Sequence, residues 1–301
     1  MYADAQSTAA SGGGSGGSML RRALRMHWPL LVGLLIVAIP SLITLGRQTW
    51  STEAGAHGPI VLATGLWLLS YNKIDLIHAG RQPWWTWLPL AAALPVYAFG
   101  RAFDFLFIEV SALYLIFIIG MVQLAGISEV RRNLFALFYL AFIIPPPGWV
   151  LDTLTSPLRE FVSYISVAIL QPMGFPIERS GVSLTIAQYQ LLVEDACAGM
   201  NSITGLTAIS LFYIYLMHRA SWRYALVLVA LIIPVAVFVN ILRVIALILL
   251  TYYYGDAVAQ GFMHVTTGMV LFAFAVASIF LIDRMMQAVL ARWHVKSEAT
   301  A

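Results

Sequence analysis

The sequence contains little charge and a single cysteine. Of its 301 residues, 10% are charged and 60% are hydrophobic, whereas a soluble domain has about 25% charged residues. This composition excludes an ordinary globular domain whose main solvent is water. Because Cys197 is the only cysteine, a disulfide within the chain and a multi-cysteine metal site are also excluded. We expect neither a metal ion nor another cofactor.

The small excess of basic residues does not indicate nucleic acid as a partner. The net charge is +3, but nucleic-acid binding requires Lys and Arg clustered in patches. Here they stand singly or in pairs between apolar runs, as they do at the ends of membrane-spanning helices. We therefore expect lipid, not nucleic acid, around the chain.

Several apolar runs approach the roughly 20 residues that a helix needs to cross the hydrocarbon core. These runs cover residues 28–46, 58–71, 84–100, 104–126, 133–150, 197–217, 224–252 and 262–282. The first has no small-residue cleavage site, so we expect a spanning helix and not a signal peptide. The sequence therefore predicts an all-α integral membrane protein, a bundle of about eight transmembrane helices.

Two short tails flank the expected membrane domain, residues 19–292. Residues 1–18 end in a Gly/Ser run typical of a flexible tail or an artificial linker. Residues 293–301 form a short tail that we expect in the cytoplasm.

The segment between the fifth and sixth runs has a mixed character. Its prolines, Pro145 to Pro147, must end the preceding helix. Apolar residues then recur at helical spacing opposite Arg159, Glu160 and Ser163, which predicts an amphipathic helix along the membrane interface. The apolar set is Leu158, Phe161, Val162, Ile165 and Ile169. Alternation over residues 182–186 predicts a short extended segment before the sixth helix.

The basic residues orient the chain. With these spans, twelve of the 17 Lys and Arg residues fall on one side, and Arg243 lies inside a helix. The other side holds only Arg47, Arg101, Arg159 and Arg179. Because cations mark the cytoplasmic side, we expect both termini in the cytoplasm of a multi-pass membrane protein.

This orientation places Cys197 at the outer end of the sixth helix. A thiol at a helix start lies near the positive end of the helix dipole, which favours the nucleophilic thiolate. Most membrane cysteines, however, are small packing residues. Asp195, two residues earlier, could orient a cation near the thiol, and Asn201 belongs to the same motif.

Arg243 and His264 accompany Cys197 on the outer side. Arg243 lies inside a helix, where a guanidinium costs about 2.5–3.5 kcal/mol unless it faces the bundle interior or snorkels to the interface. Asn240 is three residues earlier on the same helical face. Of the six histidines, only His57 and His264 fall on the outer side, and we favour His264 because it opens a helix. A nucleophile, a base and a fixed cation together are what acyl transfer requires.

At these residues the sequence resembles the exosortase and archaeosortase family, which are multi-spanning membrane cysteine transpeptidases. The resemblance extends over residues 20–290, but its specificity lies after residue 180. The residues around the cysteine are most similar to those of the exosortase B type. Three motifs in the family's order support the resemblance, namely Glu194-Asp195-Ala196-Cys197-Ala198-Gly199-Met200-Asn201-Ser202, Asn240-Ile241-Leu242-Arg243, and His264 followed by Gly268.

The resemblance implies a Cys-Arg-His site with Cys197 as nucleophile, Arg243 as the cation near the scissile carbonyl and His264 as acid and base. It implies substrates with a PEP-CTERM-type sorting signal, which is a Pro-Glu-Pro motif, a C-terminal transmembrane helix and a basic tail. The resemblance also implies a location in the bacterial inner membrane, with cleavage at its periplasmic face in cells that make exopolysaccharide and biofilm. The acceptor is water or an amine on a glycan or lipid, and the residues do not distinguish these.

Two other functions are open at this point. A small transporter would use Arg243 and Glu109 to line a substrate path, but the motifs do not recur in two halves of the chain. A zinc metalloprotease would need a His-Glu-x-x-His pair, which the sequence lacks.

Overall fold

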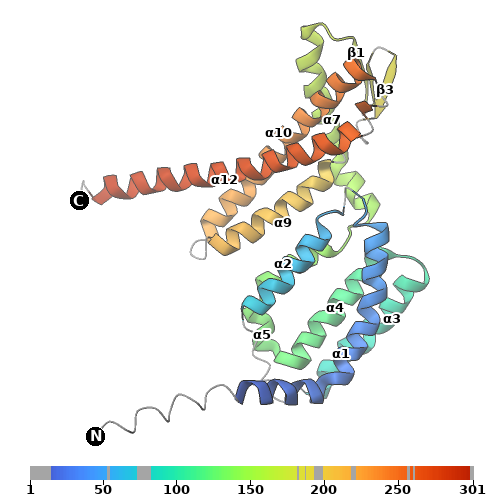
Figure 1. Cartoon of the computed structure of the whole chain (residues 1–301), viewed down its shortest axis with the longest axis vertical. Coiled ribbons are helices and arrows are strands. Elements are labelled where there is room, and N and C mark those ends of the chain that lie inside the picture. Colours follow the sequence, from blue (N-terminus) through green and yellow to red (C-terminus); the bar gives the residue numbers. More distant parts are fainter. Residues whose placement is uncertain are drawn as a thin grey trace. The chain divides into compact units, whose positions relative to one another are not determined.

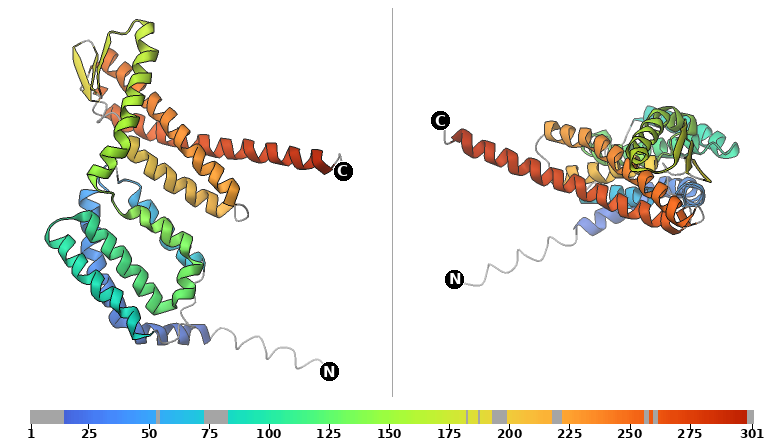
Figure 2. Two further views of the ribbon diagram at one scale, coloured as in Figure 1. Left: turned by 180° about the vertical axis from the view of Figure 1, so that it is seen from behind. Right: turned by 90° about the horizontal axis from the view of Figure 1, so that it is seen from above.

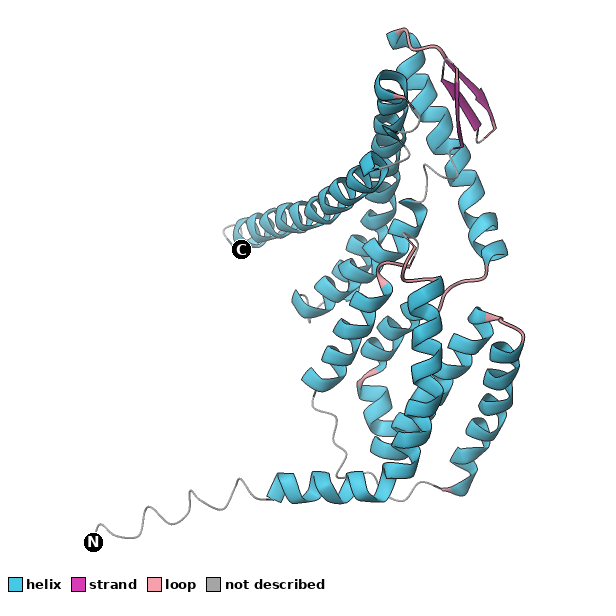
Figure 3. Cartoon of the chain, turned by 45° about the vertical axis from the view of Figure 1, so that its right-hand side comes forward, coloured by secondary structure: helices cyan, strands magenta, loops and turns pink. Residues whose placement is uncertain are grey.

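The computed structural model describes residues 15–52, 55–72, 83–181, 183–186, 188–192, 199–217, 222–255, 258–259 and 262–298. Within these ranges only the backbone is described for residues 15–27, 154, 191–192, 199–203, 222–223, 225, 262–265 and 289–298. The described part of the chain is almost entirely helical, with one small sheet (Figure 3). It forms two compact units, residues 1–49 with 59–145 and residues 50–58 with 146–301.

The first unit is built from helices alone. In chain order they are α1 (Ser15–Gln48), α2 (Gly58–Tyr71), the 3-10 turn η1 (Trp84–Trp87), α3 (Leu88–Ala102), α4 (Leu106–Ala125), α5 (Ile127–Arg132), α6 (Leu134–Leu140) and the 3-10 turn η2 (Ala141–Ile143). Helix α3 packs closely along α4 because Gly100 has no side chain. A Cβ at Gly100 would lie 2.5 Å from the backbone nitrogen of Glu109.

The second unit combines helices with the sheet. Its elements are α7 (Gly148–Leu170), the turn η3 (Gln171–Met173), β1 (Ile177–Ser180), β2 (Ser183–Ile186), β3 (Tyr189–Leu192), α9 (Gly199–Met217), α10 (Trp222–Tyr254) and α12 (Phe262–Glu298). Helix α10 packs against α9, α12 and α7. Figures 1 and 2 show that α10 runs in the opposite direction to α9 and α12. The start of α9, the end of α10 and the start of α12 therefore lie at the same end of this bundle.

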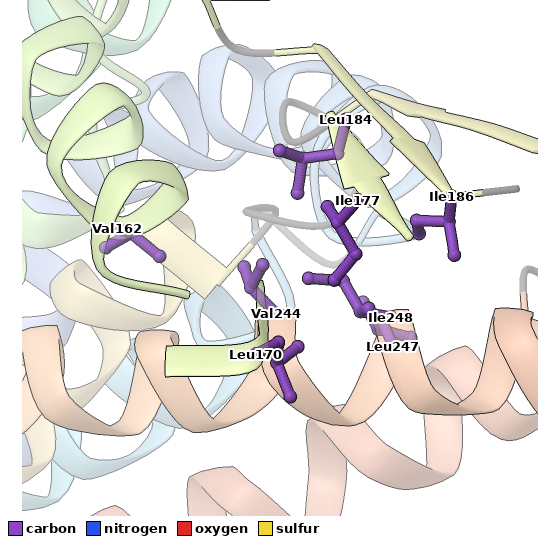
Figure 4. Packing of buried hydrophobic residues seen from close by; sticks show 8 residues of the cluster. All are labelled: Val162, Leu170, Ile177, Leu184, Ile186, Val244, Leu247 and Ile248. Atoms are coloured by element: carbon purple, nitrogen blue, oxygen red, sulfur yellow. The ribbon is translucent and has the colours of Figure 1, made fainter. Parts of the chain in front are cut away.

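The sheet is fixed to that end of the bundle. Its strands are antiparallel in the order β1-β2-β3, and their apolar side chains pack with α7 and the second half of α10. Figure 4 shows these side chains converging between the three elements. The cluster comprises Val162, Leu170, Ile177, Leu184, Ile186, Val244, Leu247 and Ile248. Removing such side chains from an apolar core typically costs about 1–5 kcal/mol, so the sheet has a firm attachment to α10.

A second apolar cluster joins α9, α10 and α12. It contains Leu206, Ile232, Ala236, Val239, Ala275 and Ile279. Toward the other end of the bundle, the buried carboxylate of Asp283 in α12 accepts hydrogen bonds from Tyr213 in α9 (2.7 Å) and Tyr224 in α10 (2.5 Å). Gln287 donates a third bond over 2.8 Å. One carboxylate thus links all three helices.

The predicted membrane architecture is supported, but not the count of eight spans. Among the described residues, four helices are long and apolar enough to cross a membrane, within Trp28–Gln48, Leu106–Ala125, Leu226–Tyr254 and Thr266–Ala288. The apolar helices Gly58–Tyr71, Leu134–Ile143 and Thr204–Met217 are shorter. The fifth expected span, residues 133–150, was drawn too long, because the helical segment ends at Ile143 just before the proline run.

The segment after the prolines differs from the prediction in extent. The expected amphipathic helix is the second half of α7, which begins at Gly148 directly after Pro147. Ser163 was expected on the polar face, but it is buried beside Val162, while Phe161 is exposed. The expected extended segment is β2, and the flanking strands β1 and β3 were not predicted.

Candidate active site

Arg243 lies inside the second unit and does not snorkel. Its side chain is only 4% exposed, so the guanidinium is enclosed by protein and does not extend to the interface. It lies against Gly268 of α12, where a Cβ would be 3.2 Å from Nη2 and 3.4 Å from Cζ. Since ordinary carbon contacts are about 3.5–4.0 Å, only glycine leaves full room for the guanidinium at this point.

Asn240 is the second buried polar group on the same stretch of α10. It is 3% exposed, and three residues separate it from Arg243, so both occupy neighbouring positions on one helical face. Its Nδ2 is buried and has no hydrogen-bond partner among the described residues. A buried amide donor costs roughly 1–3 kcal/mol when unpaired, which makes this nitrogen a ready donor for a carbonyl oxygen.

His264 lies in the first turn of α12. Its side chain is outside the description, but its backbone position is four residues before Gly268, which places both on the same helical face. The α12 backbone therefore brings His264 to within about one turn of the level at which Arg243 meets Gly268. The structure brings together the Asn240, Arg243 and His264 positions that the sequence predicted.

Cys197 and Asp195 lie outside the described residues, and Asn201 is described only as backbone in α9. The elements on both sides of Cys197 are nevertheless placed. Strand β3 ends at Leu192, and its Tyr189 hydroxyl lies 3.4 Å from where a Cβ of Gly255 would be. Gly255 ends α10 in a left-handed conformation (φ +83°). Helix α9 starts at Gly199, so the element before Cys197 contacts the residue that ends α10, and the element after it is a helix that packs against α10.

His57 is the outer-side histidine that the sequence argument ranked below His264. It is part of the 50–58 segment, which belongs to the second unit although its neighbours on both sides belong to the first. A Cβ at Gly205 of α9 would lie 3.1 Å from Cβ of His57 and 3.7 Å from its Nδ1. The contact joins residues far apart in sequence, so no local pattern could have predicted it.

Glu109 belongs to a different polar network, in the first unit. Its Oε1 accepts hydrogen bonds from Ser41 (2.6 Å) and from Arg101 (2.8 Å). Ser41 lies 3.0 Å from the hydroxyl of Tyr97. The carboxylate is thus paired with a cation and a hydroxyl of its own unit, as a buried structural charge requires.

These features agree with the comparison against protein-family models. A model described as "Transmembrane exosortase" matches residues 49–281. The chain belongs to the transmembrane exosortase family. No curated protein and no solved structure gives a significant match. The exosortase match contains the Cys197 segment, Arg243, His264 and the 50–58 segment, whereas all of α1 lies before residue 49.

Proposed function

We propose that this exosortase is a membrane cysteine transpeptidase whose site consists of Cys197, Arg243 and His264. It cleaves exported proteins that carry a PEP-CTERM-type sorting signal, and its relationship within the family is to the exosortase B type. The observation that supports the site most directly is the burial of Arg243 against Gly268. A buried guanidinium is costly in a membrane helix, and the backbone position of His264 is four residues before the Gly268 that Arg243 contacts, which supports a role for both residues in one site.

In the proposed first step, the Cys197 thiolate attacks the scissile carbonyl carbon. The carbonyl electron pair moves to oxygen, and Arg243, with the free amide donor of Asn240, stabilises that oxyanion. His264 donates a proton to the leaving nitrogen as the C–N bond breaks, which leaves a thioester on Cys197. Asp195 and Asn201 support this arrangement from the cysteine segment.

In the second step, an acceptor attacks the thioester and releases Cys197. Water would give proteolysis, and an amine on a glycan or lipid would give transpeptidation. The site faces the periplasm, and both termini lie in the cytoplasm. Processing at this face places the enzyme in the assembly of exopolysaccharide and biofilm matrix.

A processing assay tests the mechanism. The protein is co-expressed with a tagged candidate substrate that has a Pro-Glu-Pro tail, and wild type is compared with Cys197→Ala and Arg243→Ala. We expect no cleavage with the first and a loss of about 10²–10³-fold with the second, the usual effect of removing an oxyanion donor. Arg179→Ala is the matched control, because Arg179 is an exposed arginine of β1 and should leave cleavage unchanged. Processing by Cys197→Ala would refute the mechanism.

A labelling experiment tests the orientation. Because Cys197 is the only cysteine, a membrane-impermeant maleimide reports this position alone. Labelling is expected from the periplasmic side of intact cells. Labelling only after the cytoplasmic face is opened would overturn the proposed topology.

A further inference from the structure

The 50–58 segment is a short folded loop of the second unit. Within it, the amide of Gly55 bonds to the carbonyl of Thr52 (3.2 Å) and that of Gly58 to the carbonyl of Gly55 (2.8 Å). The indole of Trp50 lies directly against Gly58, where any side chain would collide with it. These contacts lie within the described residues 50–52 and 55–58 and hold His57 in position between Gly55 and Gly58.

His57 packs on the helix that follows the nucleophile. The closest atoms to a Cβ at Gly205 would be Cβ, Cγ and Nδ1 of His57, at 3.1, 3.5 and 3.7 Å. Gly205 is buried and His57 is half-buried. The imidazole therefore packs against α9 at Gly205, where the helix has no side chain.

This contact lies near the part of α10 that carries the buried guanidinium. Leu206, next to Gly205 in α9, belongs to the apolar cluster that also contains Val239 of α10 and Ala275 of α12. Val239 is four residues, or about one helical turn, before Arg243. His57 therefore contacts α9 next to a residue that packs with the helix turn preceding Arg243.

We propose that His57 is a second imidazole of the active site and serves the acceptor step. This inference rests on the proposed function. Forming and resolving a thioester requires two proton transfers, and His264 in α12 provides the first, to the leaving nitrogen. As the acceptor O–H or N–H attacks the thioester carbonyl, His57 takes its proton. The new bond to carbon forms, the C–S bond breaks, and its electron pair returns to Cys197 as the thiolate.

The test separates formation of the thioester from its breakdown. Purified enzyme in detergent is mixed with the tagged substrate, and the covalent adduct on Cys197 and the released product are followed in time. For His57→Ala and His57→Gln we expect acylation within about 3-fold of wild type and product release slowed by about 10²-fold, the usual contribution of a general base. The adduct should therefore accumulate.

Hydroxylamine provides a readout that a purely structural role would not affect. It is a strong nucleophile that attacks thioesters without general-base assistance, so it should restore product release by the His57 variants. It should not rescue His264→Ala, in which the thioester does not form. Gly205→Ala, which displaces His57, should slow release in the same way, whereas Gly33→Ala, with open space around its Cβ position, should not.

The outcomes are distinct. Unchanged product release in both His57 variants would refute the role of His57, and so would slowed acylation without adduct accumulation. If Cys197→Ala still processes the substrate, the proposed function itself is wrong, whatever the His57 variants do. If wild type forms the adduct and the His57 variants resolve it at the normal rate, only the present inference is wrong.

Discussion

Gly268→Ala is a small change that should move the active-site guanidinium. The added Cβ would lie 3.2 Å from Nη2 and 3.4 Å from Cζ of Arg243. Relief to ordinary contact distances requires a shift of roughly 0.3–0.6 Å. Arg243 is 4% exposed, so the guanidinium is enclosed and any shift takes it away from the position at which we propose that it meets the oxyanion.

The expected loss follows from how strongly catalysis depends on position. A misplacement of about 1 Å can cost roughly 10²-fold, so a shift of about half that size should lower the acylation rate by about 10-fold, or about 1.4 kcal/mol. The loss should be smaller than that of Arg243→Ala. The free energy of unfolding should not fall, because replacing Gly by Ala inside a helix stabilises that helix by up to about 1 kcal/mol.

The assay measures adduct formation on Cys197 together with the melting temperature in detergent. Gly120→Ala in α4 is the matched control, because nothing lies within 4 Å of its Cβ position, and it should keep full activity. Adding Gly268→Ala to Arg243→Ala should cause no further loss, since both act through one group. Full activity of Gly268→Ala, or additive losses in the double variant, would refute the coupling.

Three other substitutions test the surrounding fold. Gly100→Ala places a Cβ 2.5 Å from the Glu109 backbone and should destabilise the first unit by about 1–3 kcal/mol; an unchanged melting temperature would contradict the close packing of α3 on α4. Asp283→Ala leaves the buried hydroxyls of Tyr213 and Tyr224 without their acceptor, at a cost of about 1–3 kcal/mol each, and Asp283→Asn should cost less in the same denaturation experiment. Glu109→Gln keeps a hydrogen-bond acceptor and should leave substrate processing intact; a loss of activity without unfolding would argue for a path through Glu109, as in a transporter.

The sequence predicted the spans best where hydropathy and helix length coincide. Residues 104–126 correspond closely to α4, which is long enough to cross a membrane. Residues 58–71 match the bounds of α2, but this helix is shorter than the candidate spans. The prediction was less accurate where the apolar run and the helix differ in length. Helix α1 begins at Ser15, well before the apolar run, because a helix continues through arginines that a hydropathy argument excludes. The predicted span 133–150 extended past the prolines because the residues on both sides of them are equally apolar. The helical segment itself ends at Ile143.

The site shows the same division between local and tertiary information. A single arginine inside an apolar helix is visible in the sequence. The sequence left open whether it faces the bundle interior or snorkels to the interface, and the structure has it buried. The glycine that accommodates it is 25 positions later, in another helix, and the sequence offered Gly268 only as part of a resemblance. His57 stands in a glycine-rich loop, and loops of that kind usually connect helices without contributing to a site. Only the contact of His57 with Gly205 of α9 distinguishes this histidine from an ordinary loop residue.

The two glycine contacts also explain how a membrane bundle can hold long polar side chains. Next to them, α9, α10 and α12 are joined by the apolar cluster that includes Leu206, Ala236 and Ala275, and farther on by the carboxylate of Asp283. The helices are therefore fixed at one end and along the middle. At the other end, the absence of a side chain at Gly205 and Gly268 leaves room for an imidazole and a guanidinium to lie against the helix backbones. Small residues in membrane helices usually serve to bring two backbones together; here they let functional groups approach a helix, so replacing either glycine should impair chemistry before it impairs folding.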